Sequence, residues 1–205
     1  MDDWIRTAKL PSSTVARFRH VTVGDIPALK SLIKRTFPEF KYPDEWFKTF
    51  CANKKNDCCA IGCFIDETPV GLIVVSLDYL QHVDKDVSKC EKMLAAKAKR
   101  VSCLQSLGVD PNYHRLGIGA DLMRLASDYC LNHPIKPNLM YLCVDRSNYG
   151  AQELYKKFGF ENLDRKKRNH QPYLFAKWLT EKPKKIRNQK TLEDEHEDVE
   201  KLSWL

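Results

Sequence analysis

Residues 107–123, LGVDPNYHRLGIGADLM, constrain the fold more than any other part of this 205-residue chain. The segment begins as an apolar strand, is broken by a proline and continues as a helix near Ala120. Gly117 and Gly119 lie in the turn between them, where missing side chains let backbone N–H groups approach an anion and where the positive end of the helix dipole points. The segment therefore predicts a strand, a diphosphate-binding turn and a helix.

The better-known phosphate-binding turns do not match this segment. A Walker loop ends in Gly-Lys-Ser/Thr, and a dinucleotide fold needs Gly-x-Gly-x-x-Gly with an acidic residue about 20 positions later. The pattern that fits is Arg/Gln-x-x-Gly-x-Gly/Ala, read here over residues 114–119. A second block follows at residues 141–160, YLCVDRSNYGAQELYKKFGF, with an apolar strand, Asn148 at a helix start and a glycine stop at Gly159.

These two blocks, in this order, resemble the GNAT acetyltransferase superfamily over roughly residues 18–178. The resemblance implies acetyl-CoA as the acetyl donor, with its pyrophosphate on the first block. It also implies that Tyr155 lies near the thioester and protonates the leaving thiolate. The implied acetyl-CoA contacts are Leu107, Gly108, Val109, Arg115, Leu116, Gly117, Ile118, Gly119, Ala120, Asn148, Tyr155, Lys156, Lys157 and Phe158.

The remaining patterns predict an α/β (α+β) fold. Alternating or continuous apolar runs predict strands at residues 17–23, 58–65, 70–77 and 101–109, and proline with acidic residues marks helix starts near residues 26 and 43. The resulting order, β-α-α-β-β-β-α-β-α-β-β, predicts a mixed, mostly antiparallel sheet with helices on both faces. The resemblance adds a central parallel strand pair that is splayed at the acetyl-CoA site.

Changes in composition divide the chain into three parts. We expect an N-terminal extension at residues 1–15, a GNAT domain at 16–179 and a charged, flexible tail at 180–205. Residues 81–100 are polar and lysine-rich and are expected to form a long loop or insertion.

Charge and cysteine usage exclude several classes of function. The net charge of +7 comes from clusters at residues 97–100, 165–168 and 182–190, which lack interleaved aromatics, so nucleic acid is not an expected partner. The eight cysteines show no Cys-x-x-Cys spacing, so we expect no metal. Without a signal-peptide pattern or a membrane-length apolar run, reduced thiols in the cytoplasm, or in the nucleus, are expected.

A narrower resemblance concerns the acceptor. Residues 37–47 (FPEFKYPDEWF), 53–55 (NKK), 106–109 (SLGV) and 141–144 (YLCV) are similar to the catalytic subunits of the N-terminal acetyltransferases NatE and NatF. That similarity implies a protein N-terminus or peptide as acceptor. The positions it places beside the acceptor are Phe37, Pro38, Tyr42 and Gln105.

The chain departs from those enzymes where they carry their bases. Their tyrosine and histidine are replaced by Cys103 and Cys143, and a thiol with a pKa near 8.5, raised further by burial, is a poor base. We expect Cys143 to fill space as a small apolar group and Asp145, two residues along the strand, to be an alternative base. The short basic segment at residues 161–171 also differs from the hairpin of those enzymes.

Three interpretations are compatible with this loss. A protein α-amino group has a pKa of about 7.7 to 8.0 and needs little help from a base. The acceptor is otherwise a small amine or a lysine, whose pKa of about 10.4 demands more help. The third interpretation is a catalytically silent module that binds acetyl-CoA.

Overall fold

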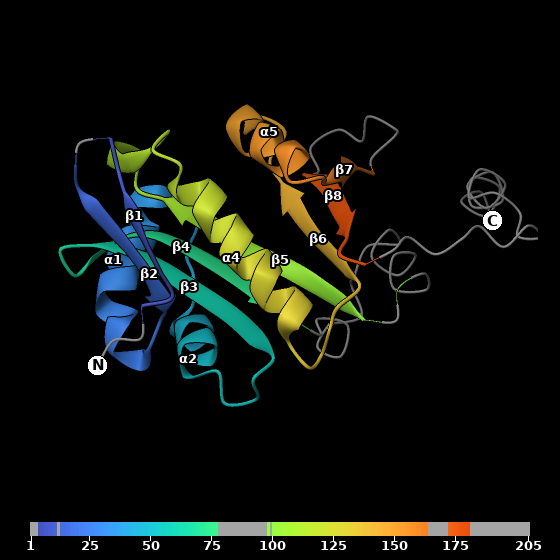
Figure 1. Ribbon diagram of the computed structural model, residues 1–205, viewed down its shortest axis with the longest axis horizontal. Coiled ribbons are helices and arrows are strands. Elements are labelled where there is room, and N and C mark those ends of the chain that lie inside the picture. The colour runs from blue at the N-terminus through green and yellow to red at the C-terminus, as the bar shows by residue number, and fades with distance from the viewer. Residues whose placement is uncertain (1–3, 12, 78–97, 99, 164–171, 181–205) are drawn as a thin grey trace, which may run out of the picture.

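The computed structural model describes residues 4–11, 13–77, 98, 100–163 and 172–180 of the chain (Figure 1). Within them, eight strands form one sheet in the order β1-β2-β3-β4-β5-β6-β8-β7. The strands are β1 (Arg6–Lys9), β2 (Val15–His20), β3 (Cys58–Ile65), β4 (Thr68–Ser76), β5 (Val101–Val109), β6 (Leu139–Val144), β7 (Glu161–Asn162) and β8 (Tyr173–Trp178). The helices are α1 (Ile26–Thr36), α2 (Asp44–Ala52), α4 (Ile118–Asn132) and α5 (Tyr149–Lys157), with 3-10 turns η1 (Val23–Asp25) and η3 (Pro111–Tyr113).

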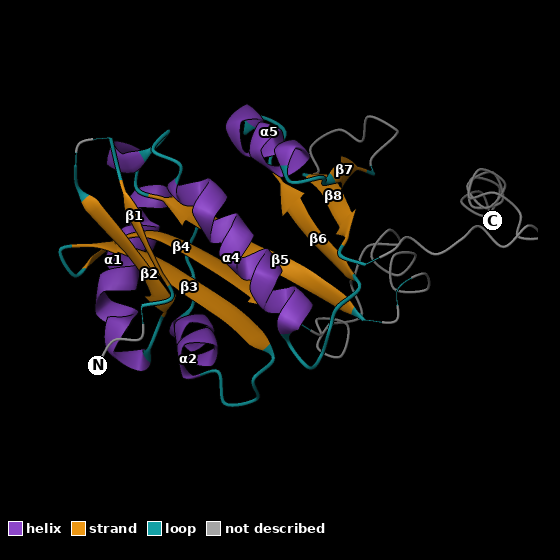
Figure 2. Cartoon of the chain, viewed as in Figure 1, coloured by secondary structure: helices purple, strands orange, loops and turns teal. Residues whose placement is uncertain are grey.

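The sheet carries helices on both faces, as predicted. Helices α4 and α5 cover one face, and α1 and α2 cover the other (Figures 1 and 2). Strand β4 is buried on both faces because its side chains alternate between two cores: Ile73 packs in the core with α4, and Leu72 in the core with α1 and α2. This double burial explains the continuous apolar run in its sequence.

One pair of described strands, β5 and β6, is parallel, and its pairing is short. The register runs from Val101 opposite Leu139 to Cys103 opposite Tyr141, although β5 continues to Val109. Beyond Cys103 the two strands diverge toward their C-terminal ends (Figure 1). The predicted fold class, with its splayed central parallel pair, is therefore confirmed.

A register shift in the neighbouring ladder accompanies this divergence. In the pairing of β4 with β5, Val74 lies opposite Ser106 and Val75 lies opposite Leu104, so Gln105 is an extra residue in β5. An extra residue bends a strand and increases its local twist. The bulge lies two residues beyond Cys103, the last residue of β5 that pairs with β6, and so falls where the two strands separate.

The sheet extends further toward the N-terminus than the domain boundary at residue 16 allowed. Strand β1 pairs with β2, from Arg6 opposite Phe18 to Lys9 opposite Val15. Its side chains are mostly exposed, so the strand carries little of the hydrophobic pattern by which a strand is recognised in a sequence. Most of the segment 81–100, the basic cluster 165–168 and the tail beyond residue 180 lie outside the described residues, and the predictions made for them remain predictions.

Candidate active site

The predicted diphosphate-binding turn, residues 110–120, is anchored to the end of β5 by backbone contacts. We call these residues the donor turn. The N–H of Asp110 donates to the carbonyl oxygen of Val70 over 2.8 Å, and its Oδ1 accepts the N–H of Asn112 at 3.1 Å, which starts η3. His114 Nε2 lies 2.8 Å from the carbonyl oxygen of Val109 and folds the turn back onto the strand. The donor turn thus begins from a fixed point at the strand's end.

Gly117 closes the turn and begins helix α4. Its φ of +87° lies in the left-handed region that glycine adopts without strain, and a Cβ there would meet nothing within 4 Å. No side chain caps the helix at this point, and the first N–H groups of a helix have no acceptors within it. The N–H groups of Ile118, Gly119 and Ala120 are therefore presented to whatever anion lies before the helix.

The donor turn lies beside both β5 and α5. A Cβ added to Gly119 would lie 3.6 Å from Leu154 of α5 and 3.8 Å from Val109 of β5. The start of α4 is thus packed where β5 and the α5 region separate. An uncapped helix start, an open glycine and diverging strands fit the pyrophosphate and the extended pantetheine arm of acetyl-CoA.

Helix α5 begins as the sequence predicts and holds Tyr155 in the core. Asn148 caps the helix by accepting the N–H of Ala151 at 3.1 Å. The ring of Tyr155 is 6 % exposed and packs against Phe160 and Phe175, with centroids 5.9 and 6.4 Å away. Burial raises the pKa of Tyr155 to about 12, so its phenol is protonated at neutral pH. Of the other predicted contacts on this helix, Lys156 and Lys157 are exposed and Phe158 is half-buried.

Four aromatic residues gather where α1 ends and α2 begins. We call Phe37, Phe40, Tyr42 and Trp46 the aromatic cluster. The rings of Tyr42 and Trp46 are 4.3 Å apart, and Phe37 lies 6.4 Å from both Phe40 and Tyr42. Phe40 is 66 % exposed, so the cluster reaches the surface. The other three members are half-buried, so all four leave apolar surface for a ligand.

A hydrogen-bonded chain fixes the aromatic cluster to the sheet. Trp46 Nε1 donates to Gln105 Oε1 at 3.0 Å, and Gln105 Nε2 donates to Ser76 Oγ at 2.8 Å. Sequence reasoning named Gln105 but missed Trp46 and Ser76. The dense run of aromatic residues between positions 37 and 50 is the signal that could have revealed Trp46.

The two cysteines at the expected base positions lie on the face of β5 and β6 that α1 and α2 share. We call this the acceptor face. Leu104, Leu142 and Val144 pack in the core with α4, so strand alternation places Cys103 and Cys143 on the opposite side. Cys103 is half-buried, whereas Cys143 is exposed.

The exposure of Cys143 corrects the expectation that it fills space in a core. Its strand has already separated from β5, because the ladder ends at Tyr141. Cys143 therefore pairs with Leu174 of β8 on one side of its strand but not with β5 on the other. Its thiol is accessible on the acceptor face.

The structure also corrects the position of Asp145. Strand β6 ends at Val144, so Asp145 begins the turn to α5 instead of continuing the face of Cys143. Its carboxylate accepts the hydroxyl of Ser147 at 2.5 Å and the N–H of Ser147 at 2.7 Å. These hydrogen bonds lower the pKa of Asp145, which makes it a weaker base than a free carboxylate.

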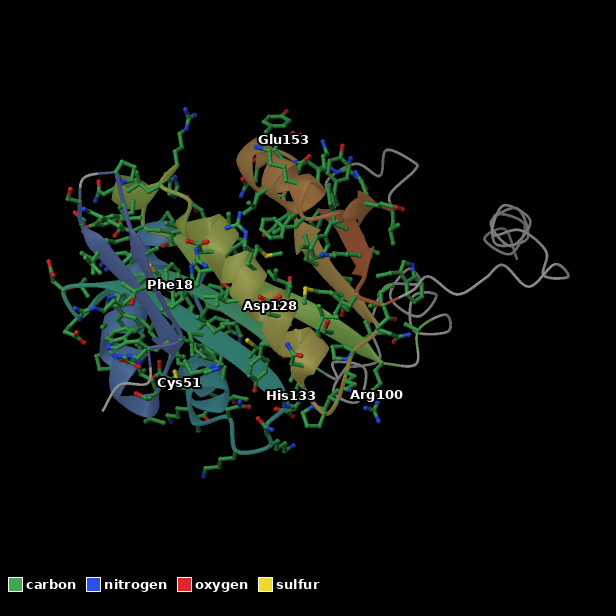
Figure 3. All side chains as sticks on the ribbon, in the orientation of Figure 1. Phe18, Cys51, Arg100, Asp128, His133 and Glu153 are labelled. Atoms are coloured by element: carbon green, nitrogen blue, oxygen red, sulfur yellow. The ribbon has the colours of Figure 1, made fainter. Side chains whose placement is uncertain are left out.

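Two other titratable side chains, those of His133 and Arg100, lie away from the donor turn. His133 follows the last residue of α4 and lies with Arg100 at the end of the helix opposite to Gly117 (Figure 3). Five described cysteines, Cys51, Cys58, Cys59, Cys63 and Cys130, are buried without disulfides. The described residues contain no cluster of side chains that could hold a metal and no helix that is long and apolar enough to cross a membrane.

Comparisons with known proteins agree with this geometry. The sequence profile of the Acetyltransferase (GNAT) family matches residues 26–160. N-alpha-acetyltransferase 50 of Danio rerio is 28 % identical over 152 residues, which cover 72 % of this chain and 75 % of that protein. An uncharacterized N-acetyltransferase of Methanocaldococcus jannaschii is 24 % identical over 71 % of this chain and 61 % of its own length.

Solved structures show the same fold. NAA60 of Arabidopsis thaliana, in complex with a bisubstrate analogue, aligns with a TM-score of 0.63 at 21 % identity over 80 % of this chain and 97 % of that chain. Naa50 of the same plant, bound to the bisubstrate analogue CoA-Ac-MVNAL, aligns with a TM-score of 0.57 at 24 % identity over 79 % and 97 %. The chain belongs to the GNAT family and is an N-acetyltransferase that uses acetyl-CoA as its donor.

Proposed function

We propose that the acceptor is the α-amino group of a protein N-terminus, which attacks acetyl-CoA directly without a covalent enzyme intermediate. The observation that carries this proposal is the pair of thiols, Cys103 and Cys143, on the acceptor face. A neutral α-amine is well populated near pH 7 to 8, whereas a lysine of pKa about 10.4 is almost fully protonated there. Cys103 and Cys143 place no strong base at the two positions where the relatives carry theirs, which suits the first acceptor better than the second.

The donor half of the reaction follows from the splayed strands. Among the described residues, the edge of β5 that faces β6 has no partner strand beyond Cys103, while its other edge pairs with β4 through Val109. The backbone groups of residues 107–109 that face this edge are thus positioned to pair with the pantetheine arm as an added strand would. A backbone N–H at this edge is also suited to stabilise the oxyanion that forms when the amine attacks the thioester carbon.

Proton transfer completes the reaction. The attacking nitrogen loses a proton to water, and the CoA sulfur gains one as the C–S bond breaks. Tyr155 is our donor to the sulfur, because burial keeps its phenol protonated at every working pH and because α5 packs beside the donor turn. Cys103 and Cys143 remain predicted contributors to the acceptor side only.

The acceptor side is suited to a peptide. The aromatic cluster offers flat apolar surface that is fixed by the hydrogen bond from Trp46 to Gln105, next to the bulge where β5 leaves β6. The similarity to N-alpha-acetyltransferase 50 and to the peptide-analogue complexes of NAA60 and Naa50 supports the same acceptor class.

A comparison of acceptors tests the proposal. We expect acetyl-CoA turnover with peptides that begin Met-Leu or Met-Lys, and little or none with spermidine or with a lysine peptide blocked at its α-amine. The rate should rise with pH through about 8, the pKa of the amine. Turnover of the blocked lysine peptide or of spermidine would instead identify a lysine or small-amine acetyltransferase. Tight acetyl-CoA binding without any turnover would identify a silent module.

A further inference from the structure

An ion pair joins the end of α1 to the first residue of the donor turn. Arg35 Nε donates to Asp110 Oδ2 over 2.7 Å, across 75 positions of sequence. The Asp110 side chain is 6 % exposed and that of Arg35 is 44 % exposed. Burial alone would raise the pKa of Asp110, but the hydrogen bonds from Arg35 and the Asn112 N–H, with the charge of Arg35, outweigh it and lower the pKa. Asp110 is therefore an ionised carboxylate with two roles: one oxygen binds Arg35, and the other accepts the Asn112 N–H at the start of η3.

Close packing next to this ion pair, where Gly108 of β5 meets the end of α1, reinforces the junction. A Cβ on Gly108 would lie 2.7 Å from Thr36 Cγ2 and 2.8 Å from the ring of Phe37, so no side chain fits there. The last turn of α1 is thus pressed against β5 immediately before the donor turn. Because the two elements are so closely packed, we expect a shift of the end of α1 to move β5 as well.

The same turn of α1 leads into the aromatic cluster. Phe37 follows α1 directly, and its carbonyl oxygen accepts the N–H of Phe40 at 3.1 Å. Arg35 therefore lies two residues from the proposed acceptor surface and contacts the donor turn directly. Among the described residues, the ion pair of the Asp110 carboxylate is with Arg35, and the charge of His114 adds a smaller interaction.

We propose that Arg35 is a positioning residue that holds the donor turn through Asp110 and couples donor binding to acceptor binding. Coupling means that occupation of the acceptor surface stiffens the end of α1, which through Arg35 stabilises the CoA-binding form of the turn. The effect is reciprocal, because each ligand must change the affinity for the other by the same factor. The coupling rests on the proposed peptide acceptor, whereas the hold on the donor turn does not.

The test measures the Kd of CoA by calorimetry, with and without an unacetylated Met-Leu peptide. CoA is used because it carries no acetyl group and therefore cannot react with the peptide. In the wild type we expect the peptide to tighten CoA binding about fivefold or more. Arg35→Ala should weaken CoA binding by itself about fivefold, since one partly exposed charged contact is lost, and should bring the coupling factor close to one. Lys34→Ala, the neighbouring exposed cation on the same helix, is the matched control and should change neither quantity.

Two further variants separate positioning from a general loss of structure. Asp110→Asn keeps a side-chain oxygen for the Asn112 N–H but removes the ion pair, so it should match Arg35→Ala, and the double variant should be no worse than either. Arg35→Lys should recover part of the CoA affinity, because a lysine supplies the charge without the planar fork. Melting temperatures are measured for every variant.

The outcomes are distinct. Wild-type CoA affinity and an unchanged coupling factor in Arg35→Ala would overturn the inference, as would additive effects of Arg35→Ala and Asp110→Asn. If the peptide fails to bind the wild type, the proposed acceptor is wrong, and the CoA affinities of the variants still decide whether Arg35 positions the donor turn.

Discussion

The donor turn and the acceptor face differ in how they are built. The donor turn consists of backbone groups supplied by one continuous segment, and its key residue, Gly117, has an open surrounding. The acceptor face is assembled from α1, α2, β4, β5 and β6. The hydrogen bond between Trp46 and Gln105, for example, joins side chains that lie 59 positions apart in the sequence. A site made of backbone tolerates changes of side chain around it, whereas a site made of side chains changes its specificity with each one. The difference predicts separable effects of mutation.

The largest expected effect is confined to the donor turn. Gly117→Val forces a β-branched residue into a left-handed conformation and places a side chain where the phosphate approaches. We expect acetyl-CoA affinity to fall about 100-fold, which corresponds to about 2.7 kcal/mol. Calorimetry with CoA measures it. Gly150→Ala, another glycine with nothing within 4 Å, is the control and should bind normally.

A smaller effect is expected for the proton donor. Tyr155→Phe should lower kcat roughly 30-fold, below the usual range for a general acid because a thiolate is a good leaving group, and should leave CoA affinity nearly unchanged. Since the pKa of Tyr155 is about 12, the wild-type rate should not fall on the alkaline side up to pH 10. Steady-state rates between pH 6 and 10 check both statements. An unchanged kcat would remove Tyr155 from the mechanism.

A base introduced at position 143 should increase the rate at which the acceptor amine is acetylated and should leave donor binding unchanged. Cys143 is exposed, so Cys143→His places an imidazole on the acceptor face without repacking a core. We expect kcat/KM to rise about tenfold at pH 7, with the pH dependence moving from about 8 toward the ordinary histidine pKa of about 6.5. Cys143→Ser, which adds no base, should behave as the wild type. If the serine variant is inactive, the thiol itself takes part in the reaction.

The smallest effect is expected for the support of the aromatic cluster. Trp46→Phe keeps a ring next to Tyr42 but removes the N–H that Gln105 accepts. The acceptor KM should rise about fivefold, or about 1 kcal/mol for one lost hydrogen bond, with no change in CoA affinity. Initial rates at saturating acetyl-CoA measure the change. Trp4→Phe, on another part of the fold, serves as the matched substitution, and an equal effect there would show that ring size rather than the hydrogen bond matters.

Local features of the site were predictable because their causes are local. The cap at Asn148 and the turn at Gly117 depend on residues within one turn of the chain, and both are found where the sequence places them. The strand β1 was missed because its exposed side chains leave no hydrophobic pattern to read.

Errors on the acceptor face arose from the geometry of the sheet. Cys143 looked like a buried residue because its neighbours are apolar, yet it is exposed because the β5–β6 ladder ends at Tyr141. Asp145 looked like the next residue of the same face, but β6 ends before it and Ser147 holds its carboxylate in a turn. Where a strand loses its partner is a property of two segments, so neither segment alone reveals it.

The sequence alone determined the position of the donor turn, because spacing along one segment specifies a backbone cradle, and its resemblance to the GNAT family indicated acetyl-CoA as the donor. Only the tertiary structure decided which side chains face the acceptor. Trp46 with Gln105 and Arg35 with Asp110 are brought together by the packing of α1 and α2 against β5. The physical reason is range: a turn is formed by neighbours in the chain, whereas a side-chain surface is formed by neighbours in space.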